Sequence, residues 1–70
     1  MEIKNEEHAA EMLKEWQSLP GLARKSRIRL AIEKLELNCM YYEQKDNEQG
    51  VARTEKCILI LKDHLAAIED

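Results

Sequence analysis

The sequence predicts an all-α fold of three helices, dominated by a long antiparallel helical hairpin and completed as a dimeric helical bundle. Its 70 residues include two Gly, one Pro, one Trp, two Tyr and no Phe, too few turn and aromatic residues for a many-stranded sheet. Strong helix formers such as Glu, Lys, Leu and Ala fill the segments between two clear breaks. A chain this short gains little net stability from one core, so we expect a second copy to complete it.

The two breaks divide a chain that we expect to form a single helical domain over residues 1–70. The first is residues 19–21, where Pro20 removes a backbone donor and Gly21 relaxes the backbone. The second is the polar segment 46–50, which ends in Gly50. The breaks leave three predicted helices, over about residues 5–18, 22–45 and 51–68.

The helix predicted over residues 5–18 has a clear start and one apolar stripe. Asn5 can cap it, and the acidic Glu6 and Glu7 suit the positive end of its dipole. Three- and four-residue spacing defines the stripe, which consists of Ala9, Met12, Leu13 and Trp16.

The helix predicted over residues 22–45 would be about 36 Å long, so we expect an elongated molecule. It carries two apolar faces. The first has the spacing of a coiled-coil seam and consists of Ile28, Ala31, Ile32, Leu35, Cys39 and Tyr42. The second lies roughly opposite and consists of Leu30, Leu37 and Tyr41.

The helix predicted over residues 51–68 is apolar on more than one side. Its main face consists of Val51, Ile58, Leu61, Leu65 and Ile68. A second face repeats every seven residues at Ala52, Leu59 and Ala66. Because the run 57–61 is apolar all round, we expect burial on all sides, with Ala52, Leu59 and Ala66 serving self-association.

The composition argues against a catalytic, membrane or secreted protein. No nucleophile–base pair, glycine-rich phosphate loop or metal-ligand spacing is evident, so we expect no cofactor, metal or catalytic residue. No apolar run approaches the roughly 20 residues that span a bilayer, and the polar start of the chain is unlike a signal peptide. Cys39 and Cys57 are expected to be reduced thiols, which places the chain in a cytoplasm.

Charge is unevenly distributed in a chain whose 11 basic and 14 acidic residues give a net charge of −3. This balance excludes a generic basic nucleic-acid coat. The basic residues concentrate at the start of the second helix, at Arg24, Lys25, Arg27 and Arg29. Either they pair with Glu11 and Glu15 of the first helix, or they form a site for an acidic protein or a phosphate.

One short motif suggests an enzyme. Glu33-Lys34-Leu35-Glu36 resembles the E-x-x-E half of the signature of all-α pyrophosphohydrolases of the MazG type, whose acidic residues on two helices hold magnesium. The second half needs E-x-x-D on the next helix, where Ile60 stands in place of the Glu before Asp63. The resemblance implies a nucleotide hydrolase and covers only these few positions.

Together these features predict a small non-enzymatic interaction module, an adaptor, inhibitor or assembly factor that docks a helix face on a protein partner. Small acidic chains of this kind are common among regulators encoded by phages and other mobile elements. The expected contacts are Trp16, Leu30, Leu37, Tyr41, Arg24, Lys25, Arg27 and Arg29. The alternatives are a nucleic-acid-binding regulator that uses the same basic residues, and a metal-dependent nucleotide hydrolase across a dimer boundary.

Overall fold

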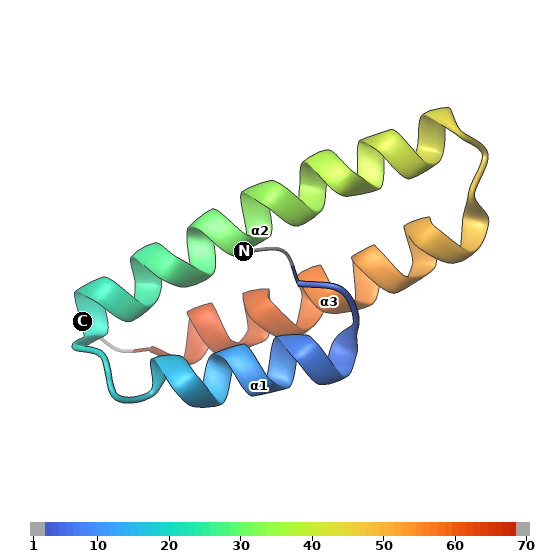
Figure 1. Ribbon diagram of the computed structural model, residues 1–70. Coiled ribbons are helices and arrows are strands. Elements are labelled where there is room, and N and C mark those ends of the chain that lie inside the picture. The colour runs from blue at the N-terminus through green and yellow to red at the C-terminus, as the bar shows by residue number, and fades with distance from the viewer. Residues whose placement is uncertain (1–2, 69–70) are drawn as a thin grey trace.

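Three α-helices make up the protein in the computed structural model, which describes residues 3–68 (Figure 1). They are α1 (Glu6–Trp16), α2 (Gly21–Gln44) and α3 (Glu48–Ala67). This part of the chain contains no strand, so the predicted all-α, three-helix class is confirmed. None of these helices is both long enough and apolar enough to cross a bilayer. Residues 1–2 and 69–70 of the predicted domain lie outside the described residues.

The helices are arranged around α3. Figure 1 shows α2 and α3 side by side along most of their length, joined by the short link of residues 45–47. The shorter α1 packs mainly against α3 and only slightly against α2. The molecule measures 38 × 19 × 19 Å, which confirms the expected elongated shape. Because α1 lies on α3 and does not fold back over α2, much of the outer surface of α2 is left uncovered.

The core lies where the three helices meet. Its buried apolar residues are Ile3, Ala9, Met12, Leu13, Ile28, Ile32, Leu35, Cys57 and Leu61. The seam predicted on the second helix therefore forms the inner face of α2. On α3, Thr54 also turns inward, and its hydroxyl donates a hydrogen bond to the carbonyl of Gly50 at 2.6 Å. This bond satisfies the buried hydroxyl without a partner from another helix.

Helix α1 begins where the sequence predicts and ends earlier. The Asn5 side chain accepts a hydrogen bond from the backbone N–H of His8 at 2.7 Å, as a helix N-cap does. The helix ends at Trp16, because the N–H of Gln17 bonds to the carbonyl of Lys14 and tightens the last turn. The predicted end at residue 18 is two residues too late.

Helix α3 begins three residues before the predicted position, at Glu48. Asn47 caps it by accepting a hydrogen bond from the N–H of Gly50 at 3.0 Å. The left-handed residue of the link is Asp46, with φ of 55°, so Gly50 is not the turn residue that the sequence suggested. Gly50 is needed for packing instead, since a Cβ there would stand 2.6 Å from the ring of Tyr42.

Candidate docking surface

The outer side of α2 carries large apolar side chains that no other helix covers. Leu30, Leu37 and Tyr41 are 53%, 66% and 56% exposed. Their spacing of seven and four residues places them in one line, because an α-helix turns about 100° per residue. The line lies opposite the buried residues of the inner face. The second apolar face predicted for this helix is thus exposed in the single chain.

Basic residues share this line. Arg27, Lys34 and Lys45 fall on the same side of α2 by helical spacing. The Nζ atom of Lys45 lies 5.8 Å from the centroid of the Tyr41 ring, a cation–π distance. We name the whole line the α2 outer stripe; it consists of Arg27, Leu30, Lys34, Leu37, Tyr41 and Lys45. Within residues 3–68, no carboxylate forms an ion pair with the stripe's three basic side chains.

A cavity opens beside one end of the α2 outer stripe. It has a volume of about 180 Å³ and lies between the start of the chain, α1 and α2. Its lining residues are Ile3, Met12, Glu15, Trp16, Arg27, Leu30, Ala31 and Lys34. Trp16 is half-buried, packing on the core with one part and lining this cavity with another. The cavity and the stripe share Arg27, Leu30 and Lys34, so they form one continuous surface.

The predicted basic cluster at the start of α2 does not stay together in the fold. Lys25 is buried, with 9% of its surface exposed. Arg24 is half-buried and, within the described residues, its buried Nε atom has no hydrogen-bond partner. Arg29 is exposed but points about 200° away from Arg27 around the helix. Of the four predicted basic contacts, only Arg27 belongs to the α2 outer stripe.

The outer side of α3 is the second exposed apolar face. Leu59 is 61% exposed, and Ala52 and Ala66 are exposed at the same helical position. The neighbouring Cys57 and Leu61 point into the core and are fully covered. In the single chain the run 57–61 is covered on its inner side only, and its burial on all sides, which we expected with a second copy, stays a prediction.

Both cysteines are free thiols, and the pKa of each is raised above its ordinary value. Burial raises the pKa of Cys39, whose thiol also donates a hydrogen bond to the Glu43 carboxylate at 3.6 Å. Burial also raises the pKa of Cys57, the Glu6 carboxylate adds to this effect, and Arg53 opposes it. A thiol with a raised pKa is a poor nucleophile at neutral pH. In residues 3–68 no group of three or more His, Cys, Asp or Glu side chains is placed to hold a metal ion.

Comparison with known proteins finds no family model that matches the chain, no similar curated protein and no similar solved structure. Function is therefore inferred from the chain's own residues.

Two surface features stand out, the α2 outer stripe and the outer face of α3, and each is turned away from the core. Sequence reasoning found the apolar members of both faces but left Lys34 and Lys45 out of the candidate site, although their helical spacing from Arg27 was available.

Proposed function

We propose that the protein is a small helical interaction module, an adaptor, inhibitor or assembly factor, that binds an acidic amphipathic helix of a partner protein through the α2 outer stripe. The observation that carries this proposal is the line of three large apolar side chains, each more than half exposed, along one side of α2. Contiguous exposed apolar surface on a small protein commonly marks an interaction site. The module acts by binding, without catalysis, and its two free thiols suit a reducing cytoplasm.

The stripe fits a helix better than it fits an extended strand. Leu30, Leu37 and Tyr41 repeat at intervals of seven and four residues, which matches the anchors of a helix packed alongside. The basic members Arg27 and Lys34 flank these anchors and favour a partner with carboxylates beside its apolar residues. The cavity between α1 and α2 would receive one apolar anchor of that partner.

A second copy of the chain is the occupant we propose for the outer face of α3, so that two antiparallel α2–α3 hairpins form one dimeric bundle. The charges beside Leu59 are arranged for this pairing. On one side of the Ala52–Leu59–Ala66 line lie Glu55 and Lys62, and on the other lie Lys56 and Asp63. With a two-fold axis beside Leu59, Glu55 meets Lys62 of the second copy, and Lys56 meets its Asp63. Opposite charges at these levels favour the antiparallel register.

Nucleic acid is the competing partner for the basic residues of α2. A nucleic-acid site gathers its basic side chains on one face, whereas Lys25 is buried and Arg29 points away from Arg27. Binding that falls steeply with salt concentration would indicate phosphate contacts. Binding through the apolar stripe is expected to persist at high salt, with a modest loss from the flanking charges.

The proposal is tested by a photo-crosslinking amino acid placed at position 37 and, in a separate variant, at position 22. Leu22 is the matched control, because it is 84% exposed on the same helix but lies off the stripe. We expect position 37 to crosslink to a defined helical segment of a partner protein in the cell of origin, identified by mass spectrometry. Equal crosslinking at both positions, or crosslinks to nucleic acid or to a second copy, would contradict the proposal.

The identified segment is then synthesised and its affinity measured with purified protein. Leu37→Asp should weaken binding by about thirtyfold or more, since a buried hot-spot anchor contributes roughly 2 kcal/mol and the new carboxylate would be unpaired. Lys34→Glu should slow association. Leu22→Asp should leave both affinity and association rate unchanged, and an equal loss in this variant would show that the effect is not specific to the stripe.

A further inference from the structure

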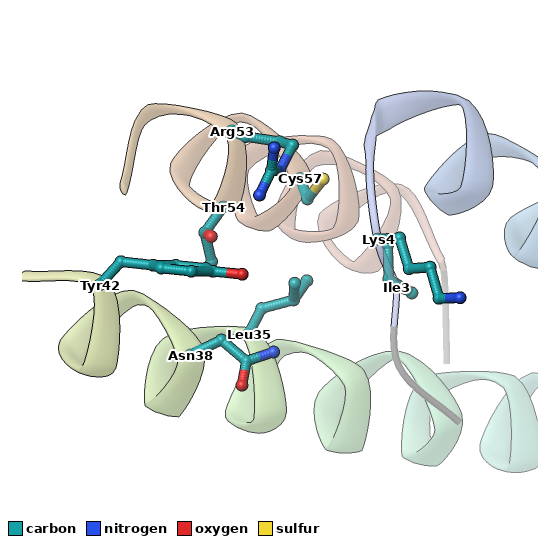
Figure 2. A pocket seen from close by; sticks show the side chains of 8 residues that line it. All are labelled: Ile3, Lys4, Leu35, Asn38, Tyr42, Arg53, Thr54 and Cys57. Atoms are coloured by element: carbon teal, nitrogen blue, oxygen red, sulfur yellow. The ribbon is translucent and has the colours of Figure 1, made fainter. Parts of the chain in front are cut away.

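A second cavity, separate from the α2 outer stripe, lies between α2 and α3. Its volume is about 350 Å³, and the start of the chain closes one side of it (Figure 2). Three buried apolar side chains, Ile3, Leu35 and Cys57, form its inner part. The polar side chains that line it are Lys4, Asn38, Tyr42, Arg53 and Thr54. The cavity therefore has a small apolar inner part, and the rest of its lining is polar.

The Tyr42 ring packs closely against α3 beside this cavity. On one side the ring packs against the backbone of Gly50, where a Cβ would stand 2.6 Å from the ring. The guanidinium Cζ of Arg53 lies 5.9 Å from the ring centroid. Figure 2 shows the Tyr42 hydroxyl extending into the space between the two helices, and within residues 3–68 this hydroxyl has no hydrogen-bond partner. The Tyr42 hydroxyl is thus available to donate a hydrogen bond in this cavity.

The charge of this cavity is opposite to that of the whole chain. The charged side chains that line it, Lys4 and Arg53, are both basic, although the net charge of the chain is −3. Within the described residues neither forms an ion pair. Glu6 lies near enough to affect Cys57 but does not line the cavity. The guanidinium of Arg53 is therefore available to bind a carboxylate or phosphate in bidentate fashion.

We propose that this cavity binds a small molecule that carries a carboxylate or phosphate group on a short apolar body. Arg53 binds the anionic group, and the Tyr42 hydroxyl and the Asn38 amide donate hydrogen bonds to it. The apolar body packs against the accessible edges of Ile3 and Leu35. Lys4, whose ammonium group extends away from Arg53 in Figure 2, adds positive potential at the rim.

The test is an NMR titration of the isotopically labelled full chain with phenyl phosphate, which combines an anion with a small apolar ring. Inorganic phosphate and benzyl alcohol serve as the separate halves of this probe. We expect saturable shifts of the backbone signals around the cavity, with a dissociation constant in roughly the millimolar range for a ligand of this size. Either half alone should bind more weakly than phenyl phosphate.

Two variants decide which side chain binds the anion. Arg53→Gln should weaken phenyl phosphate binding about tenfold, because a charge-assisted hydrogen bond is lost. Arg29→Gln, which removes an exposed arginine outside the cavity, should leave binding unchanged. The proposal is overturned if the wild-type chain shows no saturable shifts, if Arg53→Gln binds as well as wild type, or if inorganic phosphate binds as tightly as phenyl phosphate.

Discussion

The Tyr42 ring packs directly against Gly50, in space that a side chain at position 50 would occupy. Gly50→Ala would bring a Cβ to 2.6 Å from the Tyr42 ring, so the ring must move. We expect a loss of about 1–2 kcal/mol in the free energy of unfolding, because overpacking outweighs the better helix propensity of Ala. Urea unfolding followed by circular dichroism measures the change.

Gly21→Ala is the matched control for this prediction. A Cβ at Gly21 would meet nothing within 4 Å, so the variant should be as stable as the wild type or slightly more stable. Equal destabilisation of the two variants would show that Gly50 has no special packing role.

Cys57 makes stability depend on pH at the alkaline end. Because burial raises the pKa of its thiol in the folded chain, the unfolded chain loses this proton first as the pH rises. The stabilisation is fully present below the unfolded-state pKa of 9.0 and is lost as the pH rises through the higher folded-state pKa. The stability difference between the wild type and Cys57→Ala should therefore shrink as the pH rises above the unfolded-state pKa. Paired urea unfolding curves measure it, and a constant difference would contradict the prediction.

At the scale of single residues, the sequence predicted which residues of α2 are buried better than it predicted the close contact at Gly50 or the cavity around Arg53. Ile28, Ile32 and Leu35 could be assigned to the core because helical periodicity depends only on local spacing. The role of Gly50 could not be predicted, because the close approach of Tyr42 depends on how two helices pack. The cavity around Arg53 was missed for the same reason, since α2, α3 and the start of the chain all line it.

At the scale of the helix, α3 offers a direct test of which face is buried. Leu61 is 0% exposed and Leu59 is 61% exposed, two positions apart on the same helix. Leu61→Ala should lower the free energy of unfolding by about 3 kcal/mol through the cavity it leaves. Leu59→Ala should cost less than about 0.5 kcal/mol in dilute, monomeric protein. Urea unfolding of both variants at low protein concentration checks this, and similar losses would contradict the assigned faces.

The sequence was enough to predict that three helices form, but it was not enough to predict how α1 packs on the other two. All three helices were expected from helix-forming composition and two breaks, and their ends differ from the prediction by at most three residues. The early start of α3 reflects the Asn47 cap, whose signal was hidden within a polar segment. The packing of α1 on α3 follows from contacts that local periodicity does not encode. It leaves the α2 outer stripe open, which is the basis of the proposed function.

For the whole molecule, the account gives the two exposed apolar faces different occupants. We propose a second copy of the chain for the outer face of α3, and an acidic helix of another protein for the α2 outer stripe. Both faces have large apolar side chains, but their charges differ. The α3 face carries both signs in a self-complementary arrangement, whereas the charged members of the α2 outer stripe are all basic, with Glu15 and Glu33 beside them.

The measurement that tests this division most directly is absolute mass by light scattering after size exclusion, over a range of loading concentrations. The account predicts that the wild type has twice the chain mass, that Leu59→Asp reduces it to a single chain, and that Leu37→Asp leaves the dimer intact. A monomeric wild type would contradict the proposed pairing through α3. A dimer lost in Leu37→Asp and kept in Leu59→Asp would show that the α2 outer stripe is the self-association surface, and would contradict its assignment to another protein.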